Sequence, residues 1–316
     1  MTPSDRDMRR SIVIIHPGAL GDVLLAVPAM RKLRERFHGH ELALCANEPV
    51  ARLLLECREI DAWTSVQRRG CAGLFTSDGS IEGELRRWLE QCDCVVAWMQ
   101  DPDGSLARTL KNAGARKTIV SSPFSMTWKS LHQSDRFCES LQESPCRATE
   151  FQPLQFPGKV VSRGRACLER AGVRFDQPFV ALHPGSGSPR KSIAIATMAA
   201  MMTKLRDEGM RQVVIEGPAD REAVGDLLNG IGSAIAVLRD LDLATLAGVL
   251  SHAIKFVGHD SGVTHIAAAL GVPTTVFFGP TDPDRWAPLG NHVTIMQAPP
   301  DSVCLTKSWC GTSTPR

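Results

Sequence analysis

The chain has 316 residues, of which 43% are hydrophobic and 22% are charged, a composition typical of a globular protein long enough for two domains. Its formal net charge of +2 is too small to indicate nucleic acid as a partner. The first ten residues lack the apolar core of a signal peptide, and the apolar run at 11–15 is only as long as a strand. The sequence therefore predicts neither a signal peptide nor a membrane-spanning helix, and we expect a cytoplasmic protein.

Strand-like and helix-like segments alternate along the chain, which is the α/β pattern of parallel sheets with helices on both faces. In the first half, strands are predicted at 11–16, 41–46, 94–98 and 116–120. Helices are predicted at 20–37, 49–57, 81–91 and 104–113. Residues 142–158 carry three prolines among polar residues without a clear period, and we interpret them as a linker.

The same alternation begins again after the linker. Strands are predicted at 179–183, 212–216, 234–238, 254–257 and 274–278. Helices are predicted at 160–171, 193–208, 220–229, 243–252 and from about 260 to Gly271, where glycine suits a left-handed helix end. We therefore expect two Rossmann-like domains, residues 1–150 and 151–316, which face a central cleft and bind ligands at the carboxyl ends of their strands.

The ten cysteines do not form a recognisable metal or disulfide pattern. Most of them stand singly inside strand or helix patterns, where they are expected to act as small apolar residues. Cys92 and Cys94 have no second pair at the spacing of metal ligands, so no metal site is predicted. Cys304 and Cys310 could pair or stay free.

The segment between the strands at 254–257 and 274–278 is the most informative part of the chain. Its helix begins with Asp260, Ser261 and Gly262, and His265 follows one turn later. Free backbone N–H groups and the positive end of the helix dipole favour an anion at such a place. Each residue alone could be a helix cap or a polar residue near a sheet edge. Together they favour a phosphate or sugar-phosphate site.

The loop after the first strand, residues 16–22, carries two glycines and a carboxylate. Gly18 and Gly21 allow a ligand to approach the backbone, although two glycines do not make the dinucleotide-binding fingerprint. Asp22 opens the first helix, where an acidic residue commonly opposes the helix dipole. If this loop faces the cleft, Asp22 is also placed to act as a general base.

The loop after the first strand of the second half is rich in small residues. The backbone amides and hydroxyls of Gly185, Ser186 and Ser188 can converge on an anion, as in a backbone nest. Lys191 adds a positive charge suited to a phosphate. These residue types favour a phosphate-binding loop over an ordinary polar loop.

A third loop, residues 216–220, follows the next predicted strand. An acidic side chain at this position can bind ribose hydroxyls in nucleotide-binding folds. Asp220 could equally be the N-cap of the helix that follows, and taken alone the cap is the simpler interpretation.

Taken together, these loops resemble glycosyltransferase family 9, the heptosyltransferases of lipopolysaccharide assembly. Three motifs carry the resemblance in the family's order. They are GALGDVLLAVPAMRKLR at 18–34, HPGSGS at 183–188 followed by Lys191, and GHDSGVTH at 258–265 with FGPTDP at 278–283 behind it. The match extends over most of the chain.

The resemblance implies the GT-B architecture and an inverting, metal-independent transfer of heptose from ADP-heptose to the lipopolysaccharide inner core, without a cofactor. By this analogy Asp22 is the base, and Lys191 neutralises the departing diphosphate with the amides of Ser261 and Gly262. Donor-side residues would also include Gly185, Ser186, Ser188, Asp220, Asp260 and His265, and the acceptor-side loop would include Gly18 and Gly21. The first domain would bind the acceptor, a lipid-linked or other glycan at the inner face of the membrane, and the second the nucleotide sugar.

The chain also departs from the family pattern. His259 stands where Asn is usual, Asp220 where a longer Glu is commoner, and Lys191 lacks the usual Trp-Pro after it. The alternatives are the same chemistry with another sugar or acceptor, a non-catalytic nucleotide-binding homologue, and a nucleotide-sugar epimerase. The presence of both Asp22 and Lys191 favours a transferase.

The first long predicted helix is rich in basic residues, which are Arg31, Lys32, Arg34 and Arg36, and Arg68 and Arg69 follow later. These side chains could meet anionic lipid headgroups and bring the protein to the inner leaflet. Ordinary solvated helix charges are the simpler interpretation.

Overall fold

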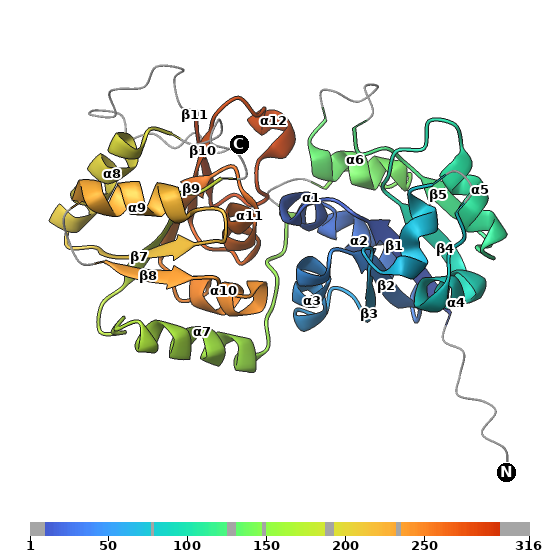
Figure 1. Ribbon diagram of the computed structural model, residues 1–316, viewed down its shortest axis with the longest axis horizontal. Helices are drawn as coiled ribbons and strands as arrows, with labels where there is room; N and C mark the ends of the chain where they lie inside the picture. The colour runs from blue at the N-terminus through green and yellow to red at the C-terminus, as the bar shows by residue number, and fades with distance from the viewer. Residues whose placement is uncertain are drawn as a thin grey trace, which may run out of the picture. The chain divides into compact units, whose positions relative to one another are not determined.

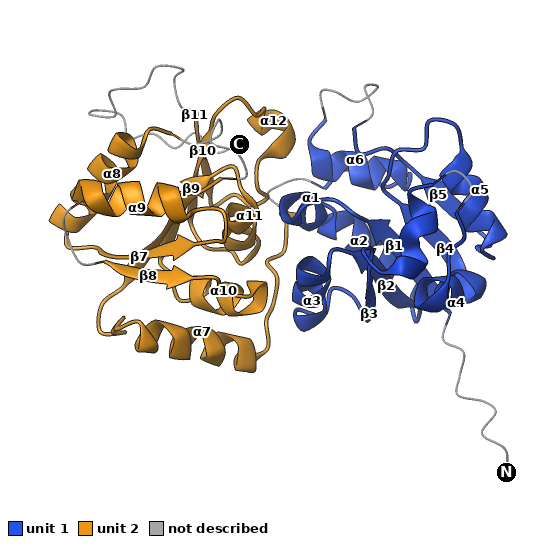
Figure 2. Ribbon diagram, viewed as in Figure 1, with its two compact units in different colours: residues 1–146 blue, residues 147–316 orange. Residues whose placement is uncertain are grey.

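The structure is a computed structural model that describes residues 10–76, 79–124, 131–146, 150–186, 193–231 and 235–297. The chain divides into two compact units, unit 1 with residues 1–146 and unit 2 with residues 147–316 (Figure 2). Each unit is built on a parallel sheet with helices around it, so the predicted α/β class is confirmed. Among the described residues, no helix combines the length and the apolar character needed to cross a bilayer.

The sheet of unit 1 has the strand order β3-β2-β1-β4-β5, and all of its pairings are parallel. The strands are β1 (Ser11–His16), β2 (Glu41–Ala46), β3 (Ala62–Ser65), β4 (Cys92–Ala97) and β5 (Thr118–Val120). The helices are α1 (Leu20–Leu25), α2 (Val27–Arg36), α3 (Glu48–Glu56), the 3₁₀ helix η1 (Arg69–Leu74), α4 (Gly83–Gln91), α5 (Ser105–Asn112) and α6 (Gln133–Ser140). The chain runs outward from β1 to β3 and then returns to β4, so the winding direction reverses between β1 and β4.

Burial explains why the strands of unit 1 read as nearly continuous apolar runs. Every residue of β1 is buried, as expected for a parallel strand that is covered on both faces. On one face Val13 and Ile15 pack with Leu85 and Leu89 of α4 and with Leu110 of α5. Cys45 is buried in this core as a small apolar residue, as expected. Cys57 and Cys138 of unit 1 and Cys167 of unit 2 are also buried, and none of these four cysteines forms a disulfide.

The single helix predicted at 20–37 is in fact two helices. Helix α1 ends at Leu25, and α2 starts at Val27. Pro28 accounts for the break, because it has no N–H to donate to the carbonyl of Leu24 and its ring crowds that carbonyl. Strand β3 and helix α6 were not predicted, since the first has only four residues and the second is mostly polar.

The sheet of unit 2 has the order β11-β10-β9-β6-β7-β8, again with parallel pairings throughout. Its strands are β6 (Phe179–His183), β7 (Arg211–Glu216), β8 (Ala236–Arg239), β9 (Lys255–His259), β10 (Thr274–Phe278) and β11 (Val293–Gln297). Its helices are α7 (Gly158–Arg170), α8 (Ile195–Asp207), α9 (Arg221–Ile231), α10 (Leu243–Leu250), α11 (Gly262–Ala269) and α12 (Pro283–Trp286). Here the winding direction reverses between β6 and β9. Gly271 has the left-handed backbone expected after α11, with φ +80°.

Helices cover both faces of this sheet (Figure 1). Met198 and Met202 of α8 and Leu227 of α9 pack with Leu182 and Val257 on one face. On the other side α7 and α10 pack closely, and a Cβ on Gly164 would lie 2.0 Å from the carbonyl carbon of Gly248. Part of the predicted linker also belongs to unit 2, because buried Leu154 donates its backbone N–H to Ala269 O at 2.7 Å.

Candidate functional site

The candidate donor site lies at one edge of the unit 2 sheet. Strands β7, β6 and β9 are neighbours in parallel register, so their carboxyl ends lie at the same edge. Three of the segments selected from the sequence start there: residues 184–186 follow β6, residues 217–220 follow β7, and residues 260–262 follow β9. Because the winding direction reverses between β6 and β9, this is where doubly wound sheets bind their ligands.

Gly185 and Asp220 come from two of these segments and lie against each other. A Cβ on Gly185 would be only 1.8 Å from Oδ1 of Asp220, so any side chain there would collide with the carboxylate. The other carboxylate oxygen, Oδ2, accepts the N–H of Gly217 at 2.9 Å and lies 3.7 Å from Nε2 of His183. Burial lowers the pKa of His183 from its usual value, and the Asp220 carboxylate opposes that shift. The described contacts thus tie the ends of β6 and β7 together.

The backbone of Asp220 also fits the capping interpretation. Its carbonyl accepts the N–H of Val224 at 2.9 Å, which places Asp220 at the N-cap position of α9. The preceding carboxylate, Glu216, is buried and accepts a hydrogen bond from Nε of Arg239 at 3.0 Å. The carboxylate of Glu216 therefore binds a side chain of β8. The carboxylate of Asp220 instead contacts Gly185 at the candidate site.

His259, the last residue of β9, connects two chain segments. Its Nε2 accepts the backbone N–H of Ile193 at 3.1 Å, and its Nδ1 lies 3.4 Å from the carbonyl oxygen of Gly185. The ring is only 1% exposed, and this burial lowers its pKa from 6.5 to about 4. His259 is consequently neutral at physiological pH.

The head of α11 is fixed to the end of β9 by hydroxyl groups. Ser261 is the N-cap, and its Oγ accepts the backbone N–H of Thr264 at 3.4 Å. The hydroxyl of Thr264 in turn donates to the carbonyl of His259. Asp260 and His265 are buried beside them, at 7% and 6% exposure, and Gly262 is the first residue of the helix.

Two predicted donor residues, Ser188 and Lys191, lie outside the described residues, as do Cys304 and Cys310. Ser186 is described and half-buried. Within the described part of the chain, no three His, Cys, Asp or Glu side chains are grouped so that they could hold a metal ion.

The candidate acceptor-side loop follows β1 in unit 1. Asp22 is half-buried in the first turn of α1, and its Oδ2 accepts the N–H of Ala19 at 3.2 Å. The carboxylate thus binds a backbone N–H at the N-terminus of α1, where an acidic residue commonly stabilises a helix. Gly21 is the second residue of α1. Asn47, which follows β2, donates its amide to the carbonyls of Pro17 and Gly18 at 3.2 and 3.0 Å.

The side chain of His16 binds the backbone of this loop. Its Nδ1 accepts the N–H of Gly18 at 3.2 Å, and a Cβ on Gly18 would lie 2.6 Å from Cε1 of His16. The rings of Trp98 and Phe137 lie 5.7 and 5.3 Å from the imidazole, which is 1% exposed. Desolvation in this aromatic setting lowers the pKa of His16 from 6.5 to about 4.

Four residues at these sites were not selected from the sequence as functional: His16, Asn47, His183 and His259. Each one ends or directly follows an apolar parallel strand. A polar residue at that position is the signal that could have identified them, because the carboxyl ends of the strands form the ligand-binding edge.

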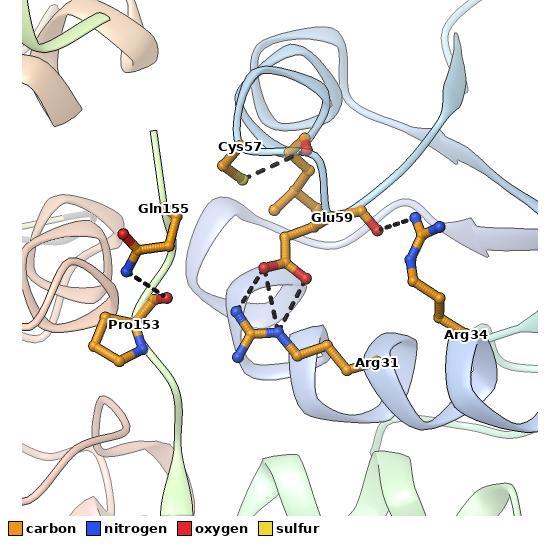
Figure 3. A network of polar contacts seen from close by, with 7 residues as sticks. Arg31, Arg34, Cys57, Glu59, Pro153 and Gln155 are labelled. Carbon is orange, nitrogen blue, oxygen red and sulfur yellow. Dashed lines mark hydrogen bonds and ion pairs between the residues drawn. The ribbon is translucent and has the colours of Figure 1, made fainter. Parts of the chain in front are cut away.

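Several basic side chains considered as a lipid-binding surface instead have partners within unit 1. Figure 3 shows the guanidinium of Arg31 on the carboxylate of Glu59 and that of Arg34 on the backbone carbonyl of Glu59. Nε of Arg31 lies 3.0 Å from Oε2, and Nη2 of Arg34 lies 3.0 Å from the carbonyl oxygen. Arg36 pairs with Glu143, Lys32 donates to Ser144 Oγ at 3.1 Å, and Arg68 lies 3.2 Å from Glu84. These contacts connect elements of unit 1.

Relatives of known function share parts of this sequence. Lipopolysaccharide heptosyltransferase 3 of Escherichia coli is 29% identical over 144 residues, which are 44% of this chain and 42% of that protein. Lipopolysaccharide heptosyltransferase 1 of Pseudomonas aeruginosa is 43% identical over 91 residues, 28% of this chain and 25% of its own length. The chain thus spans less than half the length of these relatives.

Solved structures match more of the chain at lower identity. A glycosyltransferase family 9 protein from Veillonella parvula aligns with a TM-score of 0.75 and 19% identity over 95% of this chain and 90% of its own. An Escherichia coli heptosyltransferase with ADP aligns with a TM-score of 0.65 and 20% identity over 92% of this chain and 93% of its own. At these identities the likeness shows the fold. The model of glycosyltransferase family 9 (heptosyltransferase) matches residues 125–308, more than half of the chain, and the chain therefore belongs to that family.

Proposed function

We propose that this protein is an inverting glycosyltransferase that moves a heptose from ADP-heptose to an acceptor of the lipopolysaccharide inner core without a metal ion. Family membership supports sugar transfer, and the related heptosyltransferase with ADP supports adenine nucleotide as the leaving group. One observation carries the proposal for this chain. The predicted donor segments after β6, β7 and β9 lie at one sheet edge, where Gly185 contacts Asp220.

The donor diphosphate would bind at this edge of unit 2. The head of α11 supplies backbone N–H groups and the positive end of a helix dipole, and we assign the amides of Ser261 and Gly262 to the diphosphate. Gly185 and Ser186 would line the same anion, Lys191 would add its positive charge, and Asp220 would bind the ribose. Asp260 and His265 would shape the pocket for the sugar.

Asp22 is the proposed base in unit 1. Its carboxylate would take the proton of the acceptor hydroxyl as that oxygen bonds to the anomeric carbon of the heptose. The bond from this carbon to the diphosphate oxygen breaks at the same time, and ADP leaves with the bonding electrons. Positioned amides and a lysine can stabilise the charge that develops on the phosphate, so the reaction requires no Mg²⁺.

The location follows from the proposed acceptor. A lipid-linked glycan presents its sugars at the inner face of the membrane, so we propose a cytoplasmic protein that associates peripherally with the inner leaflet. Arg31, Arg34 and Arg36 pair with carboxylates of unit 1, so we assign the membrane contact to the acceptor and not to these three side chains.

The test starts with calorimetric titration of ADP, UDP, GDP and CDP into the purified protein, with EDTA and then with Mg²⁺. Selective ADP binding in EDTA that weakens in Lys191→Ala supports the proposal. A preference for another nucleotide would replace ADP-heptose by another sugar donor. Absence of binding to all four would overturn the donor site.

Asp22→Asn then separates catalysis from binding. The amide oxygen of Asn can still accept the N–H of Ala19, so the helix end should persist while the base is lost. We expect turnover of ADP-heptose to fall by about a hundredfold or more with unchanged ADP affinity. Glu48→Gln, in the first turn of α3, is the matched control. Unchanged turnover in Asp22→Asn would exclude Asp22 as the base.

A further inference from the structure

His259 contacts two backbone positions that flank residues 187–192 in the chain. Gly185 lies two residues before this segment, and Ile193 directly follows it. The imidazole accepts the N–H of Ile193 through Nε2 at 3.1 Å and faces the carbonyl of Gly185 through Nδ1 at 3.4 Å. One buried ring thus bridges both ends of the loop that follows β6.

The two contacts define the tautomer of the ring. A backbone N–H can only donate, so Nε2 must be the unprotonated nitrogen, and a carbonyl can only accept, so Nδ1 must carry the hydrogen. This is the neutral imidazole with one donor and one acceptor, and both are used. An Asn side chain also offers one acceptor oxygen and one donor nitrogen, but on a shorter stem.

The ring is held in turn by its neighbours. The backbone carbonyl of His259 accepts the hydroxyl of Thr264, and its ring lies 6.3 Å from that of Phe277. Burial is the main cause of its lowered pKa; among the described titratable groups, His183 lowers this pKa further and Asp220 raises it. His259 therefore connects the loop after β6 to the head of α11, two segments to which we assign the donor diphosphate.

We propose that His259 is a positioning residue for nucleotide binding: it bridges Gly185 and Ile193 and so fixes the two ends of the loop after β6 relative to α11. The inference rests on the proposed function, which places the donor nucleotide at this edge. It assigns a role to a histidine that stands where the family usually has Asn.

The first test does not depend on any nucleotide. Amide hydrogen exchange reports directly on the hydrogen bond that the N–H of Ile193 donates to His259. We expect the Ile193 amide of His259→Ala to exchange at least tenfold faster than that of the wild type, and that of His259→Asn to exchange at an intermediate rate, as followed by NMR. Equal exchange in His259→Ala and wild type would overturn the proposal.

The second test measures ADP affinity of the same variants by calorimetry. His259→Ala should bind ADP at least tenfold more weakly, and His259→Asn should recover part of that loss, because its amide offers one donor and one acceptor on a shorter stem. His292→Asn is the matched control, since His292 is half-buried, bonds the carbonyl of Ala268 at 2.8 Å and precedes β11. It should leave both readouts unchanged.

The outcomes separate the two proposals. If the wild type binds no nucleotide but the Ile193 amide of His259→Ala still exchanges faster, the proposed function fails while the bridge stands. If the wild type binds ADP and His259→Ala binds equally well, the positioning role fails. Should His259→Ala not fold, ¹⁵N spectra of the wild-type imidazole decide the tautomer. A protonated Nε2 at pH 7.5 would overturn the bridge.

Discussion

The backbone of Gly185 lies directly on the carboxylate of Asp220, although the two residues belong to separate loops after β6 and β7. A Cβ at residue 185 would be 1.8 Å from Oδ1 and 2.1 Å from Cγ of Asp220. Glycine is required here by close approach and not by its backbone angles, since no positive φ is found at this position. The contact brings together two residues assigned to the donor site.

Gly185→Ala should therefore disturb the candidate donor site. The added methyl group must displace the Asp220 carboxylate, which holds the N–H of Gly217 at 2.9 Å. We expect ADP affinity to fall by about tenfold or more, and calorimetric titration measures it.

Gly225→Ala is the control for this change. Gly225 lies within α9, and a Cβ there meets no atom within 4 Å. Helix propensity predicts a gain of up to about 1 kcal/mol in the free energy of unfolding, with unchanged ADP affinity. If Gly185→Ala bound ADP as well as Gly225→Ala does, the contact with Asp220 would have no part in the site.

Gly164→Ala and Gly248→Ala should both destabilise unit 2. A Cβ on Gly164 would lie 2.0 Å from the carbonyl carbon of Gly248, and a Cβ on Gly248 would lie 2.2 Å from the carbonyl oxygen of Val160. Backbone would have to move in both cases, so α7 and α10 must separate. We expect each variant to lose about 2 kcal/mol or more in urea unfolding.

Gly158→Ala, at the exposed first residue of α7, tests whether this loss comes from the helix contact. A Cβ at Gly158 meets nothing within 4 Å. Its free energy of unfolding should remain within about 0.5 kcal/mol of the wild type. A similar loss in Gly158→Ala would mean that the α7–α10 contact is not the cause.

His16 should make the protein less stable in acid. Its pKa is about 4 in the folded chain against its usual 6.5, so below pH 6.5 the unfolded chain binds the proton more readily. The stabilising contribution is complete above pH 6.5 and is lost as the pH falls toward 4. The full loss is on the order of 3 kcal/mol, to which His259 adds a change of the same sign.

Urea unfolding of His16→Gln between pH 7.5 and 4.5 measures this contribution. The variant should lose stability less steeply in acid than the wild type, because Gln does not titrate. His38→Gln is the control, since His38 is exposed, and its pH profile should follow the wild type. A profile of His16→Gln that is parallel to the wild type would show that His16 is not the responsible group.

The pair Arg31 and Glu59 should contribute to the stability of unit 1. The carboxylate is 12% exposed and the guanidinium 26%, and Nε lies 3.0 Å from Oε2, so this pair is less screened than an ordinary surface pair. A double-mutant cycle to Ala should give a coupling of about 1 kcal/mol or more. The exposed pair Arg52 and Glu48 should give about 0.3–0.5 kcal/mol. Equal couplings would contradict the structural role of Arg31.

Much of the fold could be predicted from local patterns. The strands β1, β2, β6 and β10 have the predicted bounds, because a strand covered on both faces is a short apolar run with clear ends. Prediction was weaker where local patterns are weak. The four residues of β3, the polar helix α6 and the edge strand β11 depend on packing against their neighbours for stability.

The candidate site also has a part that the sequence predicted and a part that it did not. Asp22, Gly185, Asp220 and Ser261 could be selected from the sequence, because glycines, hydroxyls and carboxylates directly after apolar strands form a local pattern. The hydrogen bonds of His259 to Ile193 and Gly185 join residues 66 and 74 positions apart. No local pattern contains such a contact.

By itself, the sequence determined the α/β class, the family and the loops that carry polar residues, since these depend on the order of apolar runs and on short motifs. The tertiary structure decided which strands are neighbours and therefore which loops share an edge. It also decided that Gly185 contacts Asp220 and that Arg31 pairs with Glu59. The physical reason is that strand order and side-chain pairing follow from the packing of all elements together, and close packing brings distant residues within hydrogen-bond distance.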